Sequence, residues 1–132
     1  MNGLLRFRLS VLAGIAVTLA VGLGVTLIGF GAVGEYAGGV LYACLIGLLI
    51  LLLAPRVRPF LLLAATAGVC WAVEFLQLTP WPAQWAEQSF LARLVFGSTF
   101  HAPDLVPYMI GAALVAAVHT RTRPRPLPRT AP

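Results

Sequence analysis

Two carboxylates stand beside long apolar runs, and they are the side chains best suited to chemistry in this chain. Glu74 lies near the end of one apolar run, and Asp104 comes directly before another. A carboxylate within a membrane-spanning helix is costly, so it indicates a function or a specific partner. At 1.5 Å per residue, both lie roughly 21–22 Å from the opposite ends of their helices. We therefore expect the two carboxylates at the same depth.

Other polar side chains are placed to join them. Gln77 follows Glu74 by three residues and Tyr108 follows Asp104 by four, so each pair shares a helix face. Arg93 lies in the connection between the two runs and is the expected compensating charge. We predict one connected polar cluster in which Arg93 joins both carboxylates.

This cluster allows two interpretations. In the structural one, Asp104 caps a helix, Arg93 neutralises the carboxylates, and Glu74 and Gln77 tie down the loop. In the functional one, the cluster is a site in which Glu74 or Asp104 acts as acid or base; it could transfer protons, hold a cation or bind a phosphate. His101 could join the cluster, although a lone interfacial histidine is more often hydrogen-bonded to lipid head groups. The candidate binding residues are thus Glu74, Gln77, Arg93, His101, Asp104 and Tyr108.

Composition indicates where these residues lie. The chain has 132 residues, of which 60% are hydrophobic and 10% charged, whereas soluble domains are nearer 25% charged. This excludes an ordinary water-soluble domain and favours an integral membrane protein. Its net charge of +5 rests on arginine alone and serves first as a topology signal. No metal pattern, phosphate loop, nucleophile elbow or nucleic-acid module is present, so we expect no cofactor, metal or nucleic-acid partner.

The apolar runs predict an all-α membrane protein, a four-span transmembrane bundle that forms one domain over residues 1–120. A span needs about 20 residues, and Gly111 leaves room for a partner helix. A glycine-rich turn is expected over 31–39. A short interfacial helix is expected at about 83–96, marked by aromatic side chains and ended by Gly97. The predicted spans are about 9–30, 40–53, 60–78 and 105–119.

The charges predict an orientation. Eight of the nine arginines fall on one side of the four-span bundle, and Glu35, Glu87 and Arg93 fall on the other. The positive-inside rule then places both termini in the cytoplasm. The basic, proline-rich tail 121–132 should be disordered and should anchor to the cytoplasmic leaflet, so membrane lipids are the expected partners.

Two stretches resemble a known family. The end of the third span reads EFLQL, and the fourth begins with a G–F–D–L–Y–G pattern, Gly97, Phe100, Asp104, Leu105, Tyr108 and Gly111. This resembles the VanZ-like membrane proteins and, more narrowly, a small bacterial family called domain of unknown function 2809. The stretch Gly34-Glu35-Tyr36-Ala37-Gly38 is similar to that family too, although Gly39 stands where the family usually has an Asp.

The resemblance implies a protein of the bacterial cytoplasmic (inner) membrane concerned with the cell envelope, and no reaction. The leading hypothesis is a non-enzymatic envelope or lipid-interacting protein with an outward-facing Glu/Arg/Asp cluster. One rival is an enzyme that acts on a lipid-linked substrate at the outer leaflet. The other is a small proton- or cation-coupled carrier, which would need homo-oligomers because four short helices enclose little space.

Overall fold

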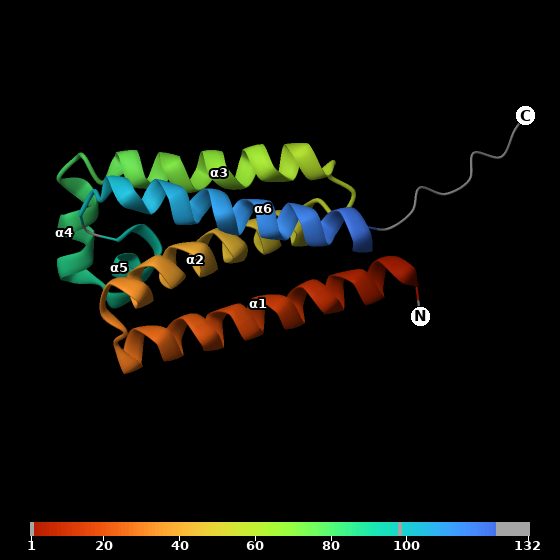
Figure 1. Cartoon of the computed structure of the whole chain (residues 1–132), viewed down its shortest axis with the longest axis horizontal. Helices are drawn as coiled ribbons and strands as arrows, with labels where there is room; N and C mark the ends of the chain where they lie inside the picture. The colour runs from red at the N-terminus through yellow and green to blue at the C-terminus, as the bar shows by residue number, and fades with distance from the viewer. Residues whose placement is uncertain (1, 98, 124–132) are drawn as a thin grey trace, which may run out of the picture.

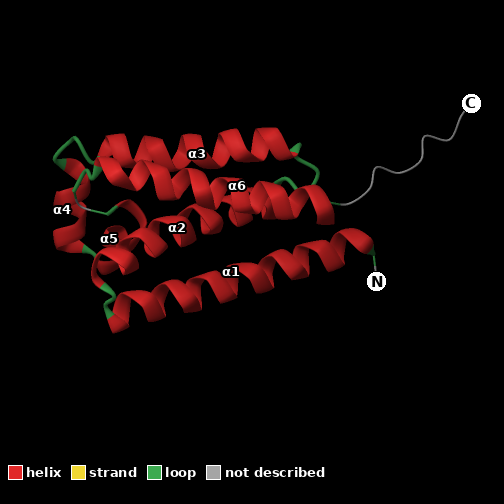
Figure 2. Ribbon diagram, in the orientation of Figure 1, coloured by secondary structure: helices red, strands yellow, loops and turns green. Residues whose placement is uncertain are grey.

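The protein is a bundle of four long helices closed at one end by two short ones. The computed structural model describes residues 2–97 and 99–123. Its helices are α1 (Gly3–Ile28), α2 (Gly31–Leu53), α3 (Pro59–Leu76), α4 (Trp81–Gln88), α5 (Phe90–Phe96), the 3-10 turn η1 (Ala102–Asp104) and α6 (Leu105–Thr122). The long helices α1, α2, α3 and α6 are long and apolar enough to cross a membrane. The predicted all-α class with four spans is confirmed, and Figure 2 shows no strand among the described residues.

Helix α6 is the centre of the bundle. It packs against α2 on one side and α3 on the other, and α1 packs against α2 (Figure 1). Its buried face includes Tyr108, Ala112 and Val115, while α1 buries only Val11. The outer faces carry large exposed apolar side chains such as Leu19 and Leu61, as expected of helices surrounded by lipid.

Small residues allow α2 and α6 to approach each other closely. A Cβ at Gly111 would collide with the Val40 carbonyl oxygen and would lie 2.7 Å from the Ala43 Cβ. On α2, Gly39 faces Pro107 and Gly47 faces Val115 in the same way. The expectation that Gly111 leaves room for a partner helix is confirmed, and that partner is α2.

The helix ends differ from those predicted most of all at the starts of α1 and α2. The Asn2 side chain accepts a hydrogen bond from Leu4 N–H (3.1 Å), so α1 begins ahead of its two arginines. The predicted turn over 31–39 is wrong: the chain reverses at Gly29 and Gly31, whose φ angles are 74° and 59°, and α2 then starts at once. The later glycines of this stretch lie within the helix.

The predicted single interfacial helix is also divided. Ser89 is extended (φ −149°), and its Oγ accepts a hydrogen bond from Ala92 N–H (3.2 Å), which ends α4 and starts α5. The Trp85 and Phe96 rings, 5.2 Å apart, hold the two short helices together. Gly97, with φ 65°, ends α5 as predicted.

Charge is separated along the bundle. The beginning of α1, the α2–α3 connection and the end of α6 lie together at one end, and α4 and α5 lie at the other (Figure 1). The first end carries six described arginines, and the second carries Arg93 and all four acidic residues. Of the predicted tail 121–132, Arg121 and Thr122 belong to α6, and residues 124–132 lie outside the described residues.

Candidate functional site

Glu74 lies in the last turn of α3 and has no exposed surface. Its Oε1 accepts a hydrogen bond from the backbone N–H of His101 (2.6 Å), and its Oε2 accepts one from the Tyr108 hydroxyl (3.0 Å). A carboxylate removed from water needs such partners, and hydrogen bonds to a charged acceptor are strong. Glu74 therefore fastens the chain before η1 and the first turns of α6 to α3.

Arg93 does not join this group, contrary to the prediction. Its Nη2 donates a hydrogen bond to the Ala86 carbonyl (3.1 Å) in the last turn of α4. Among the described residues it forms no ion pair with Glu74 or Asp104. The break at Ser89 is the reason, because it turns α5 so that the guanidinium reaches the carbonyl end of α4, where a cation is favoured. Two uncharged donors satisfy Glu74 instead.

Asp104 pairs with His101. It occupies the N-cap position of α6 but makes no side-chain cap bond there, contrary to the structural interpretation of the sequence. Its Oδ1 lies 3.1 Å from His101 Nδ1 instead. That hydrogen bond, followed by the Asp104 charge, raises the pKa of the exposed His101 above its usual 6.5, and Glu35 and Glu74 add to the effect. His101 is thus linked to one carboxylate through its ring and to another through its backbone.

Gln77 fastens the loop that follows α5. Its Nε2 donates to the Phe96 carbonyl (2.5 Å), and its amide fills the space beside Gly97 that a Cβ would need. Its Oε1 is buried and has no hydrogen-bond partner among the described residues. Gln77 therefore holds one acceptor unused.

Tyr42 and Glu35 belong to the same site, and the sequence analysis did not predict them. The Tyr42 hydroxyl donates to the Val95 carbonyl (2.7 Å), and the Tyr42 ring lies 5.8 Å from that of Tyr108. The signal was available: Glu35, Gly39 and Tyr42 have the spacing of one helix face. The predicted turn over 31–39 conceals this spacing, because residues in a turn do not share a helix face.

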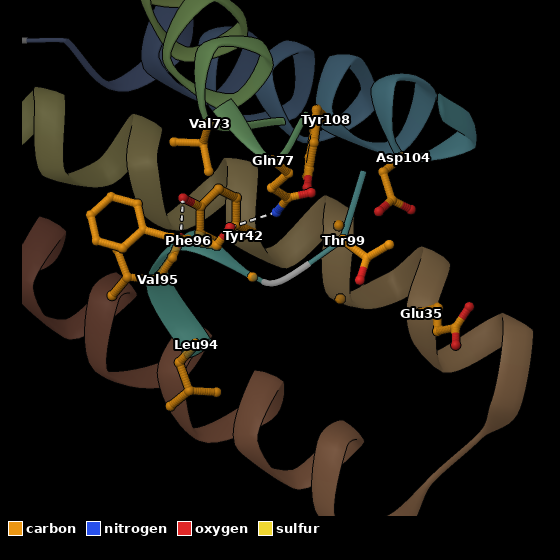
Figure 3. Close-up of a pocket in the computed structure, with 13 residues that line it drawn as sticks. Glu35, Tyr42, Val73, Gln77, Leu94, Val95, Phe96, Thr99, Asp104 and Tyr108 are labelled. Atoms are coloured by element: carbon orange, nitrogen blue, oxygen red, sulfur yellow. Dashed lines mark hydrogen bonds between the residues drawn. The ribbon is translucent and has the colours of Figure 1, made fainter. Parts of the chain in front are cut away.

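These side chains surround a partly open cavity of about 260 Å³. Figure 3 shows Glu35 from α2 and Asp104 from the start of α6 on one side of it, and Gln77, Tyr42 and Tyr108 on the other. The remaining described lining comes from α2, α3, α5 and the loop after α5 and includes no arginine. Glu74, which accepts a hydrogen bond from the Tyr108 hydroxyl, is not part of the lining.

The cavity thus collects hydrogen-bond acceptors. Its lining includes two carboxylates, two tyrosines and Gln77, although the unused Gln77 oxygen itself is buried. In the part of the chain that the structure describes, no three His, Cys, Asp or Glu side chains gather closely enough to hold a metal ion. These acceptors therefore suit a ligand with several N–H donors and a positive charge better than a bare divalent cation.

Comparison with known proteins identifies a family and no activity. The model of the family described as "Protein of unknown function (DUF2809)" matches residues 28–112. This segment contains α2 to α5, η1 and the first turns of α6, and with them every residue of the site described above. No curated protein and no solved structure matches the chain. Because the match covers more than half of the sequence, the chain belongs to the DUF2809 family.

Proposed function

We propose that this protein is a non-enzymatic protein of the bacterial cytoplasmic membrane that binds an amine-bearing head group of a lipid or lipid-linked envelope molecule. Both termini are proposed to be cytoplasmic, so that the acceptor-rich cavity opens toward the outer leaflet. The segregation of the arginines supports this orientation. The resemblance to VanZ-like proteins supports an envelope setting.

One observation carries the proposal: two carboxylates, Glu35 and Asp104, line the cavity, and its described lining includes no arginine. An ammonium group would supply a positive charge and further N–H donors to these carboxylates. The faces of Tyr42 and Tyr108 would add a cation–π contribution of about 0.5–2 kcal/mol. The volume lies just below the roughly 300–1,000 Å³ of drug-sized sites, which suits a head group rather than a whole lipid.

Lipid binding by the purified full chain tests this. Phosphatidylethanolamine and phosphatidylcholine differ in that only the first has N–H donors on its cation. Native mass spectrometry should show preference for phosphatidylethanolamine by about tenfold, the effect of roughly 1.4 kcal/mol. Free ethanolamine in excess should compete if the head group alone is recognised, and should not compete if the chains contribute most of the affinity.

Charge-removing variants locate the site. Glu35→Gln and Asp104→Asn should each lower binding by about tenfold, because each removes a charged acceptor from the cavity. Glu87→Gln is the matched control, since Glu87 is an exposed acid of α4 at the same end that does not line the cavity. Equal affinity for the two lipids, or equal loss in all three variants, would rule the proposal out.

The His101–Asp104 pair favours a second candidate, an enzyme that acts on a lipid-linked substrate at the same surface. A carboxylate that orients a histidine through Nδ1 leaves Nε2 able to transfer a proton. His101→Ala separates the two functions. It should leave ethanolamine-lipid binding intact if the protein only binds, and should abolish turnover of any substrate found if the pair is catalytic.

A further inference from the structure

A second cavity, of about 570 Å³, lies at the opposite end of the bundle and has no role in the proposed head-group site. It is a partly open groove bordered by α1, α2 and α6. It forms where α1 packs mainly along α2 (Figure 1) and makes few contacts with α6, among them Phe7 against His119. Its walls are mainly apolar and include Gly14, Leu48 and Val115.

The hydroxyls in its lining do not make it polar. Ser10, Thr18 and Thr122 each donate to the carbonyl four residues earlier in their own helix, at 3.0, 2.7 and 3.0 Å. Their donors are therefore already used, and the side chains present mostly carbon to the groove. Such a wall suits hydrocarbon.

Polar groups remain at one end of the groove only. Arg6 lines it there and forms no ion pair among the described residues. His119 lines it too: it is 1% exposed, its Nε2 bonds the Val57 carbonyl (2.8 Å), and its Nδ1 is buried without a partner in the described part of the chain. The apolar groove therefore ends beside one unpaired cation, Arg6, while the unused His119 nitrogen is buried.

The groove is elongated along the bundle. Its lining on α1 extends from Gly3 to Thr18, roughly 22 Å at 1.5 Å per residue. A mainly apolar wall of this length suits a hydrocarbon chain that lies along the helix.

We propose that this groove binds one acyl chain of an anionic phospholipid, with Arg6 holding the phosphate. Six described arginines surround this end of the bundle, so the local charge matches an anionic lipid and disfavours a cationic one. The acyl chain would lie between α1 and α6, which already meet where the Phe7 ring packs against His119 (ring centroids 5.9 Å apart).

Native mass spectrometry of the full chain with phosphatidylglycerol or phosphatidylcholine tests the proposal. One phosphatidylglycerol per chain should survive delipidation, bound about tenfold more tightly than phosphatidylcholine. Arg6→Gln should remove most of this preference. Arg8→Gln is the matched control, because it removes the same charge from the same turn of α1 but does not line the groove. Equal loss in both variants, or no preference between the lipids, would overturn the proposal.

A steric pair gives an independent test. Gly14→Leu places a side chain inside the groove, where a Cβ meets only Leu48 at ordinary contact distance (3.5 Å). Gly22→Leu adds the same bulk on the same helix, outside the groove and with nothing within 4 Å of its Cβ. Only Gly14→Leu should displace the lipid, by about tenfold or more. If Gly14→Leu instead dissociates a dimer and leaves lipid retention unchanged, the groove holds a second copy of the chain and the lipid proposal fails.

Discussion

The buried carboxylate of Glu74 determines how the polar end of the bundle is assembled. Its position was predictable from sequence, because an acid near the end of an apolar run stands out. Its partners were not, because a backbone N–H and a tyrosine hydroxyl leave no charge signature. Arg93 was the expected partner because it is the nearby cation, whereas hydrogen bonds from uncharged donors satisfy the carboxylate.

A double-mutant cycle tests this assignment. Glu74→Gln puts an amide N–H against one of the two donors and should destabilise the protein by about 1–3 kcal/mol. Tyr108→Phe should then cost less in that background than alone, since the two residues are in contact. Arg93→Ala combined with Glu74→Gln should be additive within about 0.5 kcal/mol. The measurement is unfolding in mixed detergent micelles. If Glu74 couples to Arg93 and not to Tyr108, the network predicted from sequence is correct and this assignment is wrong.

The His101–Asp104 pair predicts a pH dependence. Because Asp104 raises the pKa of His101 above 6.5 in the folded protein, the pair contributes stability below that value and loses it as the pH rises through the folded pKa. In wild type, the ring resonances of His101 should titrate above 6.5, as NMR can detect. In Asp104→Asn the midpoint should fall back toward 6.5, and an unchanged midpoint would contradict the pairing.

At the scale of elements, hydropathy predicts where the helices span the membrane but not where the chain turns. Apolar runs place the four spans because the membrane imposes their length and composition. They do not separate a glycine that makes a turn, such as Gly29, from one that lets helices pack, such as Gly39. That distinction depends on the neighbouring helix, and the error over residues 31–39 concealed Glu35 as a cavity residue.

Glycine substitutions test the contact between α2 and α6. Gly111→Ala should destabilise the bundle by about 1–3 kcal/mol, because the new methyl meets the rigid Val40 carbonyl. Gly68→Ala is the control: Gly68 is an exposed helical glycine with nothing within 4 Å of its Cβ, and alanine there should be neutral or stabilising by up to about 1 kcal/mol. Equal effects of the two changes in detergent unfolding would show that α2 and α6 do not pack this closely.

At the scale of the whole molecule, the two cavities differ in chemistry because charge is separated along the bundle. The acidic end offers acceptors around one cavity, and the arginine-rich end offers a cation beside the other. With helices of membrane-spanning length between them, the two proposed lipid contacts fall in opposite leaflets. An ethanolamine head group would then be bound in one leaflet and an anionic lipid in the other.

The orientation of the bundle decides which leaflet each site serves. Arginine resists transfer across the membrane, so the end that carries Arg6, Arg58 and Arg121 is expected to stay in the cytoplasm. Reporter fusions after Arg58 and after Pro132 should both report the cytoplasm, and a fusion after Gln88, at the end of α4, should report the outside. If the fusions after Arg58 and after Gln88 report the same side, α3 does not cross the membrane. Complete inversion of all three reporters would keep the bundle but exchange the leaflets, so that the acceptor-rich cavity would recognise a cytoplasmic amine instead of an envelope one.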